Sequence, residues 1–161
     1  RDEYDDPGTL YVIWQAPDGG HGGSMRLRST ERPVMVNDHF AHLTGGRPIV
    51  DPGIWECTRF CLGPGASPQI AAALMLAGGE VMTGLGVAQF VGVFDARMTR
   101  IYRQIGASPR VLGSEGSGRG KISVGLWSFS PAARARVAQR AGLSEELSRL
   151  WFTRAFGRSA A

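Results

Sequence analysis

The spacing of apolar and polar residues along the chain predicts strands in some segments and helices in others. Strands are expected where short runs are rich in β-branched and aromatic residues, at 10–14, 54–62, 87–94 and 121–129. The turn Pro17-Asp18-Gly19-Gly20 follows the first run and the chain resumes over 23–27, so these two segments predict a hairpin.

Helices are expected at 37–43, 69–85, 96–105 and after Ser130-Pro131. Ser67-Pro68 and Asp95 suit helix starts, and Gly106 suits a helix end. Gly78-Gly79 is expected to interrupt the second helix, and 113–118 is expected to be a flexible glycine-rich loop. The order β-β-α-β-α-β-α-β-α predicts an α/β (α+β) fold, with a mixed twisted sheet and helices on both faces.

The length of 161 residues favours a single domain, 1–161, of a soluble globular protein. No run approaches the roughly 20 apolar residues of a membrane span. The chain opens on Arg1 and an acidic stretch unlike a targeting peptide, so we interpret the start as a truncation. Cys57 and Cys61 lack a nearby histidine, so we expect no metal site, two buried free thiols and a cytoplasmic location.

The two halves of the chain differ in charge. Residues 1–96 hold 6 Lys+Arg and 11 Asp+Glu, whereas residues 97–161 hold 12 and 3. The basic second half predicts an acidic partner, for which nucleic acid and an acidic carrier protein are both candidates. A C-terminal helix with a solvated arginine face explains the same charge equally well.

Polar residues cluster near three predicted strands. Asp2 and Asp5 suit a cationic ligand, although an acidic solvated end is the simpler interpretation. Arg26 and Arg28 share one strand face, and burying them requires a carboxylate partner such as Asp2, Asp5 or Glu56. Glu56 lies between apolar residues, which raises a carboxyl pKa and suits a general base, although spacing alone favours a structural role.

The segment 54–62 also places Arg59 on the face opposite Glu56 and Thr58 unless a bulge turns the strand, and bulges recur beside active sites. Four ordered blocks contain these clusters: Asp2-Glu3-Tyr4-Asp5 with Pro7-Gly8-Thr9 and Tyr11; Ser24-x-Arg26-Leu27 with Thr30-x-x-Pro33; Phe40-x-x-Leu43; and Trp55-Glu56-x-x-Arg59-Phe60. Together they resemble the autoinducer synthase (LuxI-type) family of acyl-homoserine-lactone synthases. The resemblance covers residues 1 to about 112, and the rest of the chain is compatible with it.

The resemblance implies a GNAT-like acyltransferase fold and an enzyme that makes N-acyl-homoserine lactone for quorum sensing. The substrates would be S-adenosylmethionine and an acyl group on acyl carrier protein, joined as an amide and then closed to the lactone with release of methylthioadenosine. No cofactor is implied. Glu56, as base, and Arg59 carry over as catalytic residues. The residues that carry over to S-adenosylmethionine binding are Asp2, Asp5, Arg26, Arg59 and Phe60.

Two further sets complete the expected site. The acyl chain is expected near Met75, Met82, Phe90, Val91, Gly92, Val93, Leu126 and Trp127, although core packing explains most of these residues equally well. Gly92 is similar in position to a family threonine that accompanies 3-oxo chains, so an unsubstituted or 3-hydroxy chain is expected. Contacts to acyl carrier protein are expected at Arg97, Arg100 and Arg103, which share a helix face, and at Arg110, Arg119 and Lys121.

The sequence departs from the family at two places. The family's amino-terminal segment, which helps to close the pocket, would precede Arg1. The run 59–65 approaches but does not match the Q/R-x-x-G-x-G/A loop of CoA-dependent relatives, which favours carrier protein as donor. A GNAT-type N-acetyltransferase using acetyl-CoA is the nearest alternative. A basic nucleic-acid-binding module is less favoured because no recognition motif is present, so no nucleic acid partner is expected.

Overall fold

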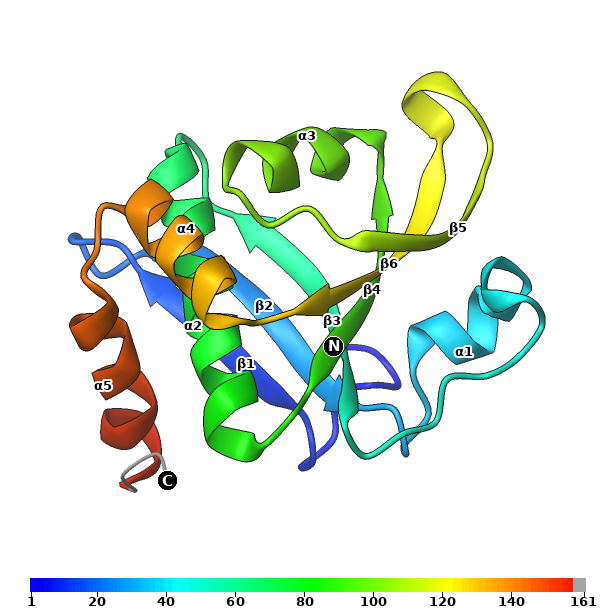
Figure 1. The fold of residues 1–161 in the computed structure, drawn as a ribbon, viewed down its shortest axis with the longest axis horizontal. Coiled ribbons are helices and arrows are strands. Elements are labelled where there is room, and N and C mark those ends of the chain that lie inside the picture. Colours follow the sequence, from blue (N-terminus) through cyan, green and yellow to red (C-terminus); the bar gives the residue numbers. More distant parts are fainter. Residues whose placement is uncertain (158–161) are drawn as a thin grey trace.

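The computed structural model describes residues 1–157, which form a six-stranded sheet with the order β1-β2-β3-β4-β6-β5 (Figure 1). β3 and β4 are parallel, and the other neighbouring pairs are antiparallel. The predicted mixed sheet is therefore confirmed. The strands are β1 (Leu10–Gln15), β2 (His21–Ser29), β3 (Ile54–Leu62), β4 (Gln89–Asp95), β5 (Arg110–Glu115) and β6 (Ile122–Ser128).

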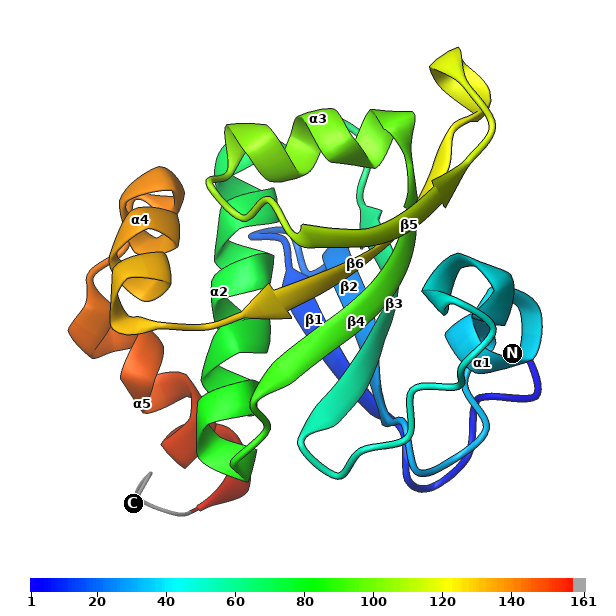
Figure 2. The ribbon, with the colours of Figure 1, turned by 45° about the vertical axis from the view of Figure 1, so that its right-hand side comes forward.

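Helices cover both faces of the sheet, as predicted (Figure 2). The long helix α2 and the shorter α3 pack on one face with α4 and α5 outside α2, whereas α1 and the 3-10 turn η1 pack on the other. Within residues 1–157 no helix is long and apolar enough to cross a membrane. The helical elements are α1 (Met35–His39), η1 (Ala41–Thr44), α2 (Pro68–Leu85), α3 (Ala96–Gln104), η2 (Gly118–Gly120), α4 (Pro131–Ala141) and α5 (Glu145–Phe156).

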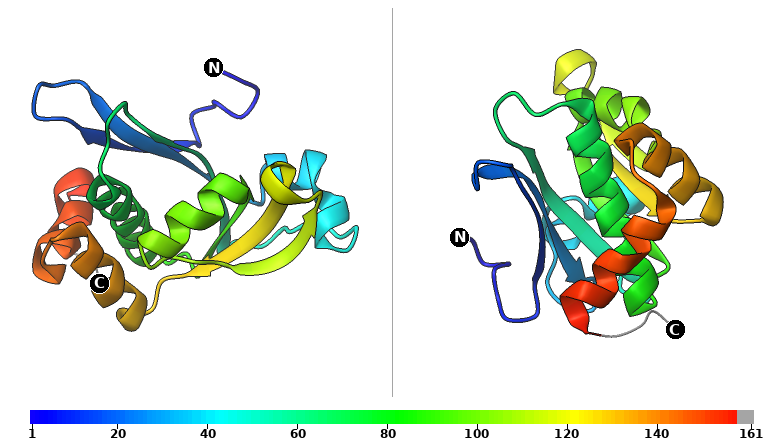
Figure 3. Two further views of the ribbon diagram at one scale, coloured as in Figure 1. Left: turned by 90° about the horizontal axis from the view of Figure 1, so that it is seen from above. Right: turned by 90° about the vertical axis from the view of Figure 1, so that its left-hand side faces the viewer.

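The strand β2 presents different chemistry to its two sides. Met25 and Leu27 are fully buried in the cluster that includes α2. Arg26 and Arg28 alternate with them and point to the opposite side, because successive side chains of a strand alternate. Figure 3 shows the N-terminal segment on that opposite side of β1 and β2. The β1–β3 half of the sheet thus has an apolar side under α2 and a polar side under residues 1–9.

The strands β3 and β4 are paired over a short length only. Their register runs from Ile54 opposite Gln89 to Glu56 opposite Val91, which is three residue pairs. Beyond that point the strands part toward α3, as Figure 1 shows. The sheet therefore opens in the middle, between its two halves.

Helix α2 is continuous, so the expected interruption at Gly78-Gly79 is wrong. A Cβ on Gly79 would lie 2.4 Å from the Phe129 ring, and one on Gly84 would lie 2.3 Å from the Phe152 ring. These glycines therefore mark places where aromatic rings approach the helix backbone closely. The packing offsets the low helix propensity of glycine.

Two of the predicted helix starts are confirmed in detail. The Asp95 side chain accepts the Met98 N–H at the start of α3, and the Ser130 side chain accepts the Ala133 N–H at the start of α4. Ser67 precedes α2 without a side-chain cap hydrogen bond.

Three expectations are corrected by the structure. Residues 113–115 belong to the edge strand β5 rather than to a flexible loop, and α5 follows α4 as an additional helix. Cys57 is partly buried and Cys61 is exposed, so the expectation that both thiols are buried is wrong, although both are free.

Candidate functional site

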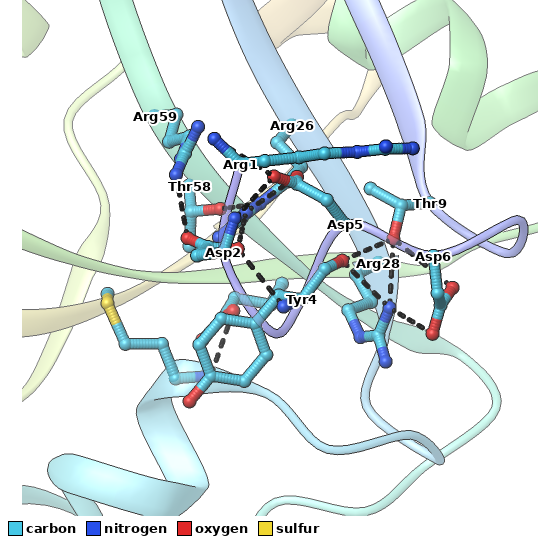
Figure 4. Close-up of polar contacts among 12 residues, drawn as sticks. Arg1, Asp2, Tyr4, Asp5, Asp6, Thr9, Arg26, Arg28, Thr58 and Arg59 are labelled. Carbon is cyan, nitrogen blue, oxygen red and sulfur yellow. Dashed lines mark hydrogen bonds and ion pairs between the residues drawn. The ribbon is translucent and has the colours of Figure 1, made fainter.

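The Arg26 guanidinium is the centre of the polar side and is only 2% exposed (Figure 4). Its Nη1 donates to Asp2 Oδ1 at 2.6 Å and to Asp5 Oδ1 at 3.0 Å. Its Nε donates to Thr58 Oγ1 at 2.9 Å, and its Cζ lies 5.5 Å from the centroid of the Tyr4 ring. The ion pairs considered from the sequence are confirmed, and they give this buried charge two carboxylate partners.

Arg59 reaches the same cluster because β3 contains a bulge. The register between β2 and β3 shifts beside Arg26, and Arg59 has a φ of 50°, in the left-handed region that side-chain residues rarely adopt. Its Nη2 donates to Asp2 Oδ2 at 2.8 Å, and its side chain remains 42% exposed. Simple alternation would have placed Arg59 on the other side of the sheet, so the bulge brings it into the site.

The Glu56 carboxylate points toward the start of α1. Oε2 accepts the Val36 N–H at 2.6 Å and Oε1 accepts the Met35 N–H at 3.2 Å. Burial, to 1% exposure, raises the pKa of Glu56, and these two N–H groups together with the charge of Arg26 oppose the rise only in part. The raised pKa expected for this residue is confirmed, and the carboxylate also fixes the position of α1.

Asp2 and Asp5 show the opposite shift. Burial would raise the pKa of Asp2, but hydrogen bonds from Arg26 and the Tyr4 backbone outweigh it and hold the pKa below its usual range. A hydrogen bond from the Tyr11 hydroxyl, followed by one from the Asp2 N–H, holds the pKa of Asp5 well below its usual range. Both side chains are therefore ionised near neutral pH beside the guanidinium groups.

Arg28 attaches the N-terminal segment at a second point. Its Nη1 lies 2.8 Å from Asp6 Oδ2 and donates to the Tyr4 carbonyl oxygen at 3.0 Å and to Thr9 Oγ1 at 2.9 Å. The Tyr4 hydroxyl in turn donates to Asp38 at 2.9 Å. The acidic partner of Arg28 is therefore Asp6, and not one of the carboxylates considered from the sequence.

A cleft of about 300 Å³ occupies the opening between β3 and β4, next to the ion-pair network. Arg59 and Phe60 line it from β3, Phe94 lines it from β4, and Tyr102 lines it from α3. The Phe60 ring meets the Tyr102 ring edge-on with 6.0 Å between centroids. Phe60 thus belongs to the apolar wall of the cleft.

A second cavity, of about 290 Å³ and called the apolar cavity here after most of its lining, lies on the α2 side of the sheet, with Arg110 and Arg136 also in its wall. Five residues expected near the acyl chain line this cavity: Met75, Met82, Phe90, Leu126 and Trp127. Gly92 does not line it, and a Cβ there would lie 2.9 Å from the Cys57 carbonyl oxygen and 3.2 Å from the Trp127 ring. Val91 and Val93 pack on the α1 side of the sheet and do not line this cavity, whereas Val93 lines the β3–β4 cleft.

The basic residues expected to contact an acidic partner are all exposed. Within residues 1–157 none of them forms an ion pair. They are Arg97, Arg100 and Arg103 on α3, Arg110 at the start of β5, Arg119 in η2 and the adjacent Lys121.

Comparison with known proteins places these features in a family. Residues 1–139 match the family described as autoinducer synthase. The chain belongs to the autoinducer synthase family. An acyl-homoserine-lactone synthase of Rhizobium etli is 37% identical to it over 134 residues, which are 79% of this chain and 63% of that protein. The chain thus spans less than two thirds of the length of this relative.

Two solved structures are similar to the chain over most of its length. The CoA-dependent acyl-homoserine lactone synthase MesI has a TM-score of 0.77 at 29% identity, over 89% of this chain and 74% of MesI. TofI, in a ternary complex with an inhibitor and MTA, has a TM-score of 0.74 at 25% identity, over 91% of this chain and 76% of TofI. The GNAT-like fold implied by the sequence resemblance is confirmed.

The structure adds contacts in this member of the autoinducer synthase family that the sequence analysis did not assign. Tyr4 packs against Arg26, the Tyr11 hydroxyl donates to Asp5, and Asp6 pairs with Arg28. The tyrosines stand in the first block of the family resemblance, but nothing in their spacing indicates these partners. Within residues 1–157 no three His, Cys, Asp or Glu side chains form a group that could hold a metal ion.

Proposed function

We propose that this chain is the substrate-binding and catalytic part of an acyl-homoserine-lactone synthase that acts on S-adenosylmethionine. The observation that carries the proposal is the single network of Asp2, Asp5, Arg26 and Arg59 beside the β3–β4 cleft. Its charges of both signs suit a ligand with sulfonium, ammonium and carboxylate groups. The similarity to TofI, which was solved with MTA, supports the same substrate, because methylthioadenosine is what remains when S-adenosylmethionine loses its amino-acid part.

The first proposed step acylates the amine of S-adenosylmethionine. That amine is largely protonated near neutral pH and must lose a proton before its nitrogen can attack a thioester carbonyl. A C–N bond then forms, the C–S bond of the thioester breaks, and the donor thiol leaves with a proton. A backbone N–H at the β3 bulge is proposed to stabilise the oxyanion formed on the way.

Glu56 is the proposed base for this step. Its raised pKa makes it a stronger proton acceptor than an exposed carboxylate. Both of its oxygens already accept N–H groups of α1, so the proton is proposed to pass through an intervening water. The same carboxylate would then both position α1 and receive the proton.

The second proposed step closes the lactone. The substrate carboxylate attacks the γ carbon, a C–O bond forms, the C–S bond of the sulfonium breaks, and methylthioadenosine leaves as a neutral thioether. Arg59 is proposed to orient this carboxylate because its side chain is 42% exposed, whereas Arg26 already binds two carboxylates. The scheme requires no cofactor, because S-adenosylmethionine is consumed as a substrate.

Acyl carrier protein is the proposed donor, and the cytoplasm is the proposed location. Arg97, Arg100 and Arg103 are exposed on α3, the helix whose Met98 and Tyr102 line the cleft, so an acidic protein bound there could deliver a thioester into the cleft. The acyl chain is proposed to enter the cleft and extend toward the apolar cavity. Acyl-CoA is the competing donor, because MesI is CoA-dependent.

The proposal is tested by incubating the full-length protein with S-adenosylmethionine and either acyl carrier protein or CoA carrying the same acyl group. We expect mass spectrometry to detect methylthioadenosine and acyl-homoserine lactone in equal amounts, with faster turnover from the carrier protein. Faster turnover from CoA would overturn the donor assignment. Acyl transfer to another amine without methylthioadenosine would instead support an N-acetyltransferase and overturn the proposed function.

Glu56→Gln tests the base. We expect a large fall in kcat and the loss of the acidic limb of the pH–rate profile, because an amide accepts no proton. Glu146→Gln is the matched control, since Glu146 is an exposed carboxylate on α5 and α5 contributes no residue to the lining of the cleft. A Glu56→Gln enzyme with unchanged kcat would remove Glu56 from the mechanism and leave the family assignment intact.

A further inference from the structure

The side of β4 that faces the helices connects the cleft with the apolar cavity. Phe94 lines the cleft and Phe90 lines the cavity, and Gly92 lies midway between them on the same side of the strand. The last pair between β3 and β4 is Glu56 with Val91, and beyond it the Cys57 carbonyl oxygen of β3 lies 2.9 Å from where a Cβ on Gly92 would be. An acyl chain that enters the cleft must therefore pass Gly92 to reach the cavity.

Trp127 of β6 covers this point. It is opposite Phe90 in the β4–β6 register, and a Cβ on Gly92 would lie 3.2 Å from Cζ3 of its ring. The Trp127 ring meets the rings of Tyr102 and Phe94 edge-on, with centroid distances of 5.0 and 5.7 Å. Since those two rings line the cleft and Trp127 lines the cavity, one layer of aromatic side chains separates the two spaces.

The orientation of the Trp127 ring is fixed at its polar end as well. Its Nε1 donates to the carbonyl oxygen of Ala107 at 2.7 Å, and Ala107 is itself buried between α3 and β5. A partly buried indole with a satisfied N–H and two edge-on aromatic neighbours has one favoured orientation. The ring therefore acts as a fixed partition rather than as a side chain that moves aside.

We propose that Trp127 determines the length of acyl chain that the enzyme accepts. With the indole in place, the chain ends against the aromatic layer, and the cavity beyond it stays out of reach. Replacing the indole by a smaller side chain joins the cleft to the cavity. Gly92 contributes to the same boundary, because a side chain there would press against both the Cys57 carbonyl oxygen and the Trp127 ring. This inference rests on the proposed function.

The test compares kcat/KM over a series of straight-chain acyl donors for the full-length wild type, Trp127→Phe and Trp127→Leu. Each methylene that gains or loses an apolar pocket changes kcat/KM about 10- to 200-fold. We expect wild type to show a sharp fall at one chain length, and Trp127→Leu to recover activity by at least about 10-fold for the first chain beyond that length. Trp127→Phe retains a ring over Gly92 and should shift the limit less.

Trp14→Leu is the matched control. Trp14 is a partly buried tryptophan that packs edge-on against Trp151 of α5 at 6.4 Å, away from the cleft. It should lower the melting temperature without changing the chain-length profile. If Trp127→Leu does not fold, Trp127→Met provides the same comparison with a longer side chain.

The two proposals fail in different ways. A folded Trp127→Leu or Trp127→Met protein with the wild-type chain-length limit would overturn the role of Trp127. A wild-type enzyme that releases no methylthioadenosine with any donor would overturn the proposed function instead.

Discussion

The two sides of strand β2 are both buried over Met25–Arg28, but by different kinds of interaction. On the α2 side, Met25 and Leu27 meet apolar side chains. On the side of the N-terminal segment, Arg26 and Arg28 meet carboxylates, a hydroxyl and backbone carbonyls. Apolar burial is non-directional and depends on shape, whereas a buried guanidinium needs each of its partners. The stability of one side of β2 therefore depends on apolar packing, and the stability of the other side depends on ion pairs and hydrogen bonds.

Arg26→Met should have the largest effect on stability. It removes the guanidinium that neutralises Asp2 and Asp5, so these carboxylates lose their buried partner. We expect the free energy of unfolding to fall by about 3–5 kcal/mol, measured by urea denaturation. Arg32→Met is the control, because Arg32 is half exposed and pairs with Asp6 at 3.1 Å, and it should cost at most about 1 kcal/mol. Equal losses in the two variants would contradict the distinction between the sides.

Gly84→Ala should have an intermediate effect through packing on the α2 side. Alanine gains about 1 kcal/mol of helix propensity over glycine. Its Cβ, however, would lie 2.3 Å from the Phe152 ring, and overpacking of this kind costs about 1–3 kcal/mol. We expect a net loss of stability in urea denaturation that Phe152→Leu partly reverses in the double variant. A stabilised Gly84→Ala protein would show that α5 moves away without cost.

Stability should depend on pH through the charged side of β2 and not through the apolar side under α2. The pKa values of Asp2 and Asp5 are lowered in the folded state, so their contribution is present above the ordinary carboxyl pKa near 4 and is lost as the pH falls through the folded values. Glu56 has the opposite sign, because its raised pKa favours the protonated folded form at low pH. We expect Asp2→Asn to flatten the fall in melting temperature below about pH 4, whereas Gly84→Ala should shift the whole curve without changing its slope.

Arg59→Gln should have the smallest effect on stability and a large effect on turnover. An exposed ion pair is worth about 0–1 kcal/mol, so the melting temperature should change little. The KM for S-adenosylmethionine should rise and kcat should fall, since the substrate carboxylate loses its partner. Arg59→Gly tests the backbone, because glycine adopts a φ of 50° without steric cost. If the glycine variant keeps the turnover, the bulge rather than the guanidinium is what the reaction needs.

The regular, alternating features of the fold can be predicted from the residue pattern, whereas the irregular features cannot. The charged face of β2 follows from Arg26 and Arg28 standing two residues apart, and the start of α3 follows from Asp95. The position of Arg59 does not follow, because the bulge is a property of how β3 pairs with β2 and leaves no residue pattern of its own. The predictions of a helix interruption at Gly79 and of a loop at Gly113 are wrong for a related reason. A glycine that admits a neighbouring ring or backbone looks the same in the sequence as one that breaks a helix or forms a loop.

The three residue pairs between β3 and β4 also have a mechanical consequence. They are the only hydrogen-bonded connection between the two halves of the described sheet, β1–β3 and β4-β6-β5, and α2 packs across both halves. The angle between the two halves can change by bending at the β3–β4 pairing while the hydrogen bonds within each half stay intact. A molecule bound in the cleft would push on the β3–β4 pairing first, so the width of that molecule would determine how far apart the two halves lie.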